Sequence, residues 1–280
     1  MRSIRGYGLV LALPMLGWQI AFFVAPLLFL VALSLWQVRN FRLEPAMSLA
    51  NWRYVLTDDV FWATYARSWF NASVATVVTA LVAFPCAYAI AFKLRDGARR
   101  LAIFLLVIPF FTSYLVRAYS WQIFLTDNGV FNAALGLFGL GPVPMINTFF
   151  GTLIGYMTLT LPLVVLLQAL GLMSVDKALI EAAHNLNCGR VRTVFAVVIP
   201  AAKVGLVIAG LFCFILAFGD FVSPLYLGGG KSPTLPILIT DTTKSGQQWP
   251  RAAVIALVMI LTLLAVAFAS IRYAYRRRGS

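Results

Sequence analysis

The chain has 280 residues, of which 61% are hydrophobic and only 11% are charged. Soluble domains carry roughly a quarter charged residues, so this composition excludes an ordinary soluble protein and indicates a membrane protein. The formal net charge of +13 would suggest nucleic-acid binding in a soluble chain. Here the basic residues flank apolar runs, so we interpret them as signals of membrane orientation and expect membrane lipid, not nucleic acid, as a partner.

Six apolar stretches are long enough to cross the bilayer as helices. A hydrocarbon core about 30 Å thick requires roughly 20 apolar residues per helix, which leaves only short connections between six spans. The first stretch follows Arg2 and Arg5 without a convincing cleavage site, which favours a retained span over a signal peptide. The expected fold is an all-α integral membrane protein with one domain over residues 1–280. Its predicted spans are 7–35, 69–92, 101–121, 148–173, 204–222 and 252–271.

The distribution of Lys and Arg predicts the orientation of these spans. With a cytoplasmic N-terminus, the inside segments hold 14 of the 22 Lys and Arg residues, and the longer outer segments hold the other eight. This bias predicts that both termini are cytoplasmic, in a bacterial inner membrane. The first outer segment, 37–68, is rich in Trp and Tyr and is expected to lie along the membrane interface.

The cytoplasmic segment 174–203 is too long for a simple connection. Ser174 is a candidate helix N-cap, with Asp176 in the first turn. The helix is expected to end near Asn187, because Asn187 and Gly189 are the residue types that most readily adopt a left-handed backbone. Its apolar residues recur at helical spacing at Leu179, Ala182, Ala183 and Leu186.

A second short helix is predicted after this turn, and Pro200 is expected to end it before the fifth span. Its apolar stripe consists of Val191, Val194, Phe195 and Val198. Periodicity alone leaves two interpretations open. In the first interpretation the helix-turn-helix packs under its own helix bundle, and in the second it binds a partner protein.

The residue order in this segment resembles the EAA loop of ABC importer permeases. That motif reads Glu-Ala-Ala, three residues, Gly, nine residues, then Ile-x-Leu-Pro. This chain has Glu181-Ala182-Ala183 and Pro200 at the same separation, with conservative aliphatic replacements at Val197 and Ile199. Asn187 occupies the family's glycine position, and Gly189 comes two residues later.

The resemblance implies a type I ABC importer permease fold with a cytoplasmic coupling helix in the loop 174–203. In that family the loop fits a groove of a separate ATPase dimer, which binds ATP and Mg. The chain itself would then bind no cofactor and would pair with a second homologous permease subunit beneath a substrate-binding protein. The coupling residues would be Glu181, Ala182, Ala183, Asn187, Gly189 and Pro200.

Two further stretches, 109–121 and 218–224, resemble the spermidine and putrescine permeases of this superfamily. A polyamine or another small cationic amine is therefore the expected solute, although related branches carry thiamine, sulfate, molybdate, ferric iron or phosphonates. Arg117 and Asp220 form either a structural pair or part of the substrate pathway, because an ionisable group is costly against lipid. Tyr119, Trp121 and Tyr226 would be either cation-π partners of an amine or interfacial aromatic residues.

Other classes of function have less support in the sequence. His184 is the only histidine, and the three cysteines show no metal-binding spacing, so no metal site is expected. Neither an HExxH nor a GxSxG stretch occurs, so we do not expect an enzyme. A self-sufficient channel or secondary transporter is the rival hypothesis, but it would need ionisable residues within the membrane, and few are present.

Overall fold

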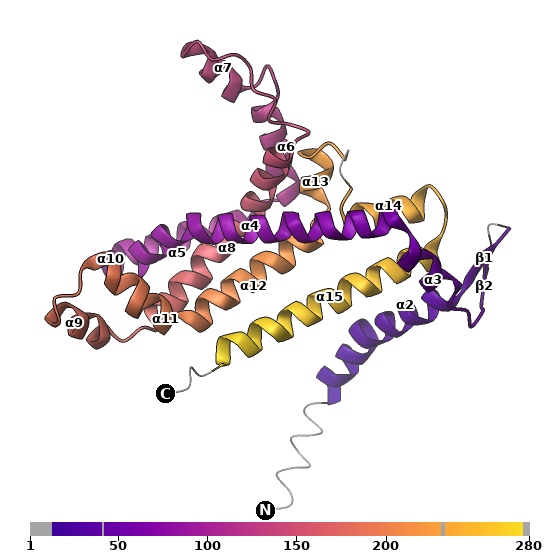
Figure 1. The fold of residues 1–280 in the computed structure, drawn as a ribbon, viewed down its shortest axis with the longest axis horizontal. Coiled ribbons are helices and arrows are strands. Elements are labelled where there is room, and N and C mark those ends of the chain that lie inside the picture. Colours follow the sequence, from indigo (N-terminus) through magenta and orange to yellow (C-terminus); the bar gives the residue numbers. More distant parts are fainter. Residues whose placement is uncertain (1–12, 41, 231–232, 277–280) are drawn as a thin grey trace, which may run out of the picture. The chain divides into compact units, whose positions relative to one another are not determined.

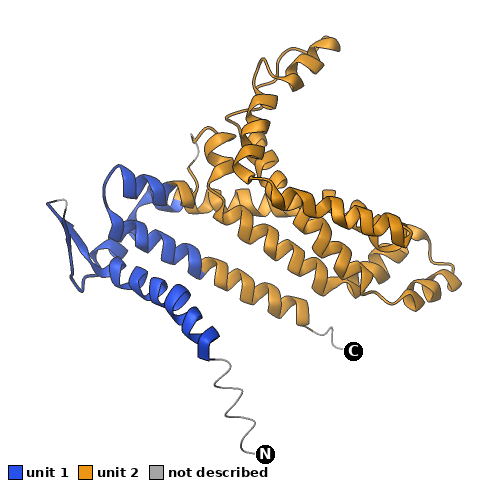
Figure 2. Cartoon of the chain, turned by 180° about the vertical axis from the view of Figure 1, so that it is seen from behind, with its two compact units in different colours: residues 1–62, 238–261 blue, residues 63–237, 262–280 orange. Residues whose placement is uncertain are grey.

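The computed structural model describes residues 13–40, 42–230 and 233–276. Arg2 and Arg5, and thus the predicted start of the first span, lie outside the described residues. The chain divides into two compact units (Figure 2), one of Met1–Trp62 with Leu238–Leu261 and one of Ala63–Ile237 with Thr262–Ser280. The prediction of a single domain stays a prediction.

Within the described residues, four helices are long and apolar enough to cross a membrane. They are Leu13–Leu35, α4 (Asp59–Phe92), α8 (Phe149–Met173) and α15 (Trp249–Tyr275). Two bent helix pairs raise the number to six if each pair is one span. The predicted helical membrane fold with about six spans is therefore confirmed. Pro85 and Pro162 lie inside α4 and α8, as membrane helices permit when neighbouring groups satisfy the freed carbonyls.

In the first unit, a β-hairpin and a short helix follow the first span. The span includes a π-helix, Ile20–Val24, and α2 (Ala25–Leu35); β1 (Gln37–Arg39) and β2 (Arg42–Glu44) follow as an antiparallel pair. Helix α3 (Ala50–Thr57) is tied to the end of α2, because the Asn51 side-chain amide donates to the carbonyls of Ser34 (3.2 Å) and Trp36 (2.7 Å). The prediction of one interfacial segment over 37–68 missed this hairpin, and α4 begins ten residues before the predicted Trp69.

The second unit contains the main hydrophobic core. Small side chains from α4, α8 and α12 (Lys203–Gly219) fill it, including Ala83, Ala87, Ala169 and Ala209. Helices α8 and α12 pack closely, as Figure 1 shows. A Cβ atom on Gly171 would lie only 2.8 Å from the Gly205 Cα, so this crossing requires glycine. Such close backbone approach through small residues is typical of membrane helix pairs.

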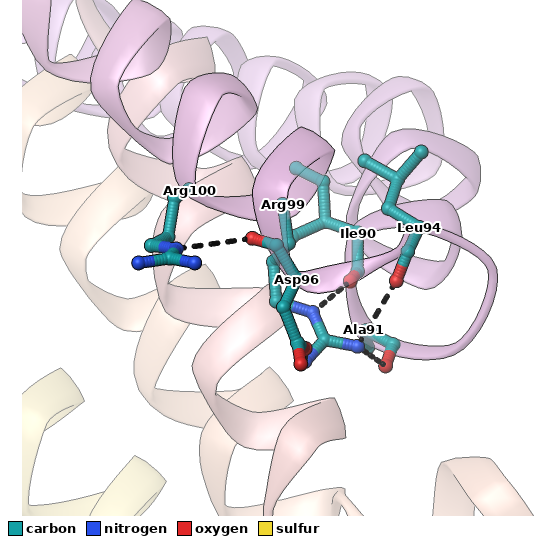
Figure 3. A network of polar contacts seen from close by, with 6 residues as sticks. All are labelled: Ile90, Ala91, Leu94, Asp96, Arg99 and Arg100. Carbon is teal, nitrogen blue, oxygen red and sulfur yellow. Dashed lines mark hydrogen bonds and ion pairs between the residues drawn. The ribbon is translucent and has the colours of Figure 1, made fainter.

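A basic side chain closes the turn between α4 and α5 (Asp96–Val107). The Arg99 guanidinium donates to the carbonyls of Ile90 (2.9 Å) and Ala91 (3.3 Å) in the last turn of α4, and of Leu94 (3.2 Å) just after it (Figure 3). It also contacts the Asp96 carboxylate at 3.2 Å. Because the carbonyls at a helix C-terminus lack intrahelical partners, Arg99 caps the end of this span.

The third span is not the straight helix that the sequence predicted over 101–121. The chain passes from α5 into a short 3-10 helix, Ile108–Phe111, and then bends by 92° into α6 (Tyr114–Leu125) and α7 (Val130–Leu137). Pro109 lies at the start of the 3-10 helix, where its missing N–H costs little. The bend falls at the polar pair Thr112 and Ser113, which interrupts the apolar run too briefly to separate two predicted spans.

The fifth span is also bent, by 76° between residues 190–201 and α12. Contrary to the prediction, Pro200 does not end the preceding helix. The chain continues through three short helical segments, α10 (Arg190–Thr193), a π-helix (Val194–Val198) and α11 (Ile199–Ala201), and the break follows at Ala202. A π-helical turn before a proline re-pairs backbone groups that the missing N–H would otherwise leave free. The C-terminal end of α12 leads into α13 (Val222–Tyr226), and α14 (Leu235–Lys244) precedes the last span.

Candidate functional site: the coupling loop and the Asp220 cluster

The first helix of the loop 174–203 is α9 (Lys177–Asn185). Its N-cap is Asp176, whose carboxylate accepts a hydrogen bond from the Ala178 N–H at 2.9 Å. The predicted N-cap, Ser174, instead donates its hydroxyl to the Gly171 carbonyl at 2.7 Å, at the end of α8. Both residue types are good N-caps, so the sequence did not distinguish them.

Asn187 makes the turn at the end of α9. Its φ is +53°, in the left-handed region, whereas Gly189 has φ −61° and an extended backbone at the N-cap of α10. The Asn187 N–H donates to the His184 carbonyl (2.9 Å), and the Cys188 N–H donates to the Ala183 carbonyl (3.0 Å). This pair of bonds is the Schellman motif, which usually carries glycine at the left-handed position. Asn187 thus provides the left-handed residue at the position where the EAA motif has glycine.

Helix α9 keeps an apolar stripe exposed. Leu179 is 49% exposed and Leu186 is 84% exposed, and Ala182 lies between them on the same face. Glu181 is also exposed and forms no ion pair within the described residues. Ala183, on the same stripe one turn after Leu179, is buried, and Ile180 packs against the main hydrophobic core. The helix therefore attaches to its own chain through Ile180 and Ala183, while the rest of the stripe stays exposed.

The second part of the loop is similarly divided. Thr193 and Val198 are buried, whereas Val191 and Phe195 are 71% and 67% exposed. The predicted apolar stripe therefore does not pack as one unit against the bundle. Pro200 is exposed in α11, directly before the bend at Ala202.

The Asp220 carboxylate lies at the other end of α12 and is buried. One oxygen accepts from the Val222 N–H (2.9 Å), and the other accepts from the Ser223 N–H (3.1 Å) and the Tyr114 hydroxyl (2.7 Å). The Ser223 hydroxyl also donates to it and contacts the Tyr114 hydroxyl. This carboxylate therefore holds the start of α13 and links it to α6.

Arg117 does not pair with Asp220, and no ion pair joins them within the described residues. Its guanidinium instead donates to the Thr158 carbonyl of α8 at 3.1 Å and lies 5.9 Å from the centre of the Tyr114 ring. Its Nε is buried without a hydrogen-bond partner. A buried donor without a partner is costly, so this end of α6 holds an unused hydrogen-bond donor.

The predicted aromatic residues have two different surroundings. Tyr119 packs against Tyr226 of α13, with ring centres 4.8 Å apart, and is 45% exposed. Trp121 packs against a buried apolar cluster of Leu125, Met145 and Leu227. Tyr119 is thus available to a ligand on the surface of the unit, whereas Trp121 contributes to packing.

Sequence reasoning did not single out two members of this cluster. Tyr114 and Ser223 complete the hydrogen bonds of Asp220, and both lie inside the stretches 109–121 and 218–224. The available signal was their position in those stretches, because a tyrosine and a serine in apolar sequence need partners.

A separate polar cavity of about 230 Å³ lies between α4, the start of α8 and the chain after α13. Arg67 and Asn71 line it from α4, and Asn147 and Thr148 line it from the turn before α8. Within the described part of the chain, Arg67 forms no ion pair. The sequence analysis placed Arg67 in an outer segment and gave it no role.

Comparisons with known proteins agree with this architecture. Residues 60–279 match the family model described as "Binding-protein-dependent transport system inner membrane component". The chain is 28% identical over 257 residues to the spermidine/putrescine transport system permease protein PotB of Haemophilus influenzae, covering 89% of this chain and 88% of that protein. It is 27% identical over 250 residues to PotB of Escherichia coli, covering 88% and 90%.

A solved structure gives the same result for the fold. A bacterial ABC transporter involved in the import of the acidic polysaccharide alginate superposes with a TM-score of 0.74 at 14% identity, covering 99% of this chain and 97% of that one. Together these findings define a membrane permease subunit. The chain belongs to the family of inner-membrane components of binding-protein-dependent transport systems, and it is a permease of the ABC importer class.

Proposed function

We propose that this permease imports a polyamine or another small cationic amine. The observation that carries the proposal is the similarity to the spermidine/putrescine permeases, which extends over 88–94% of this chain. The chain would form half of the pathway, and a second homologous permease subunit would form the other half. A substrate-binding protein would deliver the solute on the outer side of a bacterial inner membrane.

We further propose that ATP and Mg bind only to a partner ATPase dimer, with the loop 174–203 as the coupling element. Three features support this role: the exposed stripe of Leu179, Ala182 and Leu186, the exposed carboxylate of Glu181, and the Schellman turn at Asn187. A carboxylate beside small and apolar residues suits a groove that contains a basic side chain. Motion of the ATPase would then pass to α8 and α12, since the loop connects them directly.

Charge reversal of Glu181 tests the coupling role. Glu181→Lys is expected to weaken association with the co-expressed ATPase and to lower ATP-dependent uptake at least about tenfold, because a basic partner would be repelled. Glu44→Lys, a charge reversal in the β1–β2 hairpin that breaks only an exposed ion pair with Arg39 (3.8 Å), is the control and should leave both measurements unchanged. Unchanged association and uptake in Glu181→Lys would remove the coupling proposal.

The solute is tested by competition for the cognate binding protein, followed by uptake into vesicles that contain the whole transporter. Spermidine and putrescine are expected to compete with the native solute at lower concentrations than thiamine or sulfate. Uptake that continues without the ATPase would instead favour a self-sufficient transporter.

A phosphonate is the second candidate solute. The chain is 30% identical over 154 residues, 54% of its length, to a putative 2-aminoethylphosphonate transport system permease protein, PhnU, of Salmonella typhi. The cavity beside Arg67 also suits an anionic group better than an amine, because a guanidinium recognises phosphonate or carboxylate oxygens. Stronger competition by 2-aminoethylphosphonate than by putrescine would select this alternative.

A further inference from the structure

A large groove in the second unit lies at the end of the coupling loop and shares no residue with the Asp220 cluster or the cavity beside Arg67. It has a volume of about 1110 Å³ and is lined by Phe195 and Pro200 at the end of the coupling loop, Lys203 and Val207 at the start of α12, and Tyr273 and Arg276 at the end of α15. Ligand pockets usually measure roughly 300–1,000 Å³, so this groove can hold a large ligand. It lies on the side of the coupling loop, because the loop leads directly into α12.

The groove combines an apolar wall with a cationic end. Phe195, Ile199, Leu206 and Val207 provide aliphatic and aromatic surface, and none of the lining residues in the described part of the chain is acidic. Lys203 lies with its Nζ 4.1 Å from the centre of the Tyr273 ring and makes no ion pair among the described residues (the helices are labelled in Figure 1). Arg276 is exposed at the same end of α15. The groove is therefore complementary to a ligand with a negative head and an apolar tail.

The positions of the cations in the spans favour a lipid as this ligand. Lys203 is the first residue of α12, directly after the bend at Ala202, and Arg276 directly follows the last residue of α15, so both cations lie at the ends of long apolar helices. Lys and Arg at such helix ends commonly contact lipid phosphates, and tyrosine rings such as Tyr273 and Tyr275 are common at the same level. A polyamine would be repelled by the two cations, so the groove is not a second site for the proposed solute.

We infer that this groove binds one anionic phospholipid from the leaflet on the side of the coupling loop. The phosphate lies between Lys203 and Arg276, and an acyl chain lies along Leu206 and Val207 of α12. The site lies directly after the bend at Ala202. Bound lipid therefore contacts the segment that links the coupling loop to α12, and it supports the short helix α11 from the membrane side.

Native mass spectrometry of the full-length chain, purified in detergent and titrated with phosphatidylglycerol or phosphatidylcholine, tests this inference. Wild-type protein is expected to retain one phosphatidylglycerol in preference to phosphatidylcholine. Lys203→Gln and Arg276→Gln should each weaken the binding of phosphatidylglycerol by about fivefold, and together by more than about tenfold, because each cation near a phosphate contributes separately. Lys203→Arg should retain binding, since it keeps the charge.

Two further variants control for folding and for surface charge. Arg100→Gln removes an exposed cation of α5 that makes a single long hydrogen bond of 3.4 Å to a backbone carbonyl, and it should leave lipid binding unchanged. Val207→Trp fills the groove without changing charge and should also weaken phosphatidylglycerol binding. Equal binding of both lipids, or undiminished binding in the double glutamine and Val207→Trp variants, would overturn the inference. So would a cross-link from a cysteine at Val207 to the second permease subunit with no lipid retained, which would show that protein covers the groove.

Discussion

Asn187 is the residue at which the coupling loop depends most on a single backbone conformation. Its φ of +53° places an ordinary L-residue in the left-handed region, and the two bonds of the Schellman motif hold it there. Asparagine tolerates this region better than most residues because its short polar side chain bonds locally. The angle between α9 and the following helix α10 therefore depends on the backbone conformation of this one residue.

Substitutions at Asn187 are expected to separate backbone strain from side-chain contact. Asn187→Gly should leave thermal stability and uptake at or slightly above wild type, because glycine adopts this conformation without penalty. Asn187→Val should lower the free energy of unfolding by about 1–2 kcal/mol and reduce association with the ATPase, because a β-branched side chain disfavours φ above zero. Thermal unfolding and co-purification measure the two effects, with Leu137→Val, an 87% exposed position at the end of α7 and outside the loop, as the β-branched control. Equal behaviour of the glycine and valine variants would show that the turn does not depend on φ.

The sequence predicted the residues of this loop better than their individual contacts. Asn187 and Gly189 were both candidates for the turn, because residue type limits which side chains accept a left-handed backbone, and the structure has Asn187 in that conformation. The N-cap was assigned to Ser174 and not to Asp176, because both side chains can accept from a free N–H and only the three-dimensional path shows which one does. Tyr114 and Ser223 were missed for a related reason. Their partner Asp220 lies 106 residues from Tyr114, and such long-range pairing is not encoded in local spacing.

At the scale of the elements, helix type and approximate position were predictable, and bends were not. The span over 148–173 was predicted within one residue of α8, because its apolar run ends at polar residues on both sides. The third span bends by 92° at Thr112 and Ser113, a polar pair too short to end the apolar run on either side. Hydrophobicity measures only transfer into lipid, so it cannot distinguish one straight helix from two helices joined at an angle.

The crossing of α8 and α12 depends on two glycines, and we predict that it fails when one gains a side chain. Gly171→Leu should lower the free energy of unfolding by more than about 2 kcal/mol, because the helices must separate and lose packing along their whole contact. Gly171→Ala should have a smaller effect in the same direction, since its Cβ would lie 2.8 Å from the Gly205 Cα. Unfolding in a graded series of denaturing detergent measures both.

The control for this crossing is Gly210→Ala, in the partner helix α12. A Cβ there would meet only the Thr76 methyl group at 3.7 Å, an ordinary contact, so stability should be unchanged or slightly higher. If Gly210→Ala and Gly171→Ala lowered stability equally, the loss would come from helix propensity or membrane insertion and not from the close approach of the two helices.

At the scale of the whole molecule, the chain exposes more apolar surface than a protein in water could. The first span illustrates this, because Ser34 is the only buried residue of α2 while Leu28, Phe29 and Val31 are exposed. Lipid or another subunit must cover these side chains, since apolar surface of this extent is unstable in water. This agrees with a permease that is only one part of a larger transporter, and it makes the orientation of the spans the property to test.

We predict that the coupling loop and the β1–β2 hairpin lie on opposite sides of the membrane. The bias of Lys and Arg places the loop 174–203 inside, and an odd number of spans then separates it from the hairpin. In a background in which Cys86, Cys188 and Cys213 are replaced, Met47→Cys is expected to react with an impermeant maleimide in intact cells. Leu186→Cys should react only after permeabilisation. Both positions are suitable because Met47 is 92% exposed and Leu186 is 84% exposed, so a lack of labelling reflects the membrane and not burial within the chain. Labelling of Leu186→Cys in intact cells would place the loop outside, where no ATPase could reach it, and the coupling role of Glu181 would fail with it.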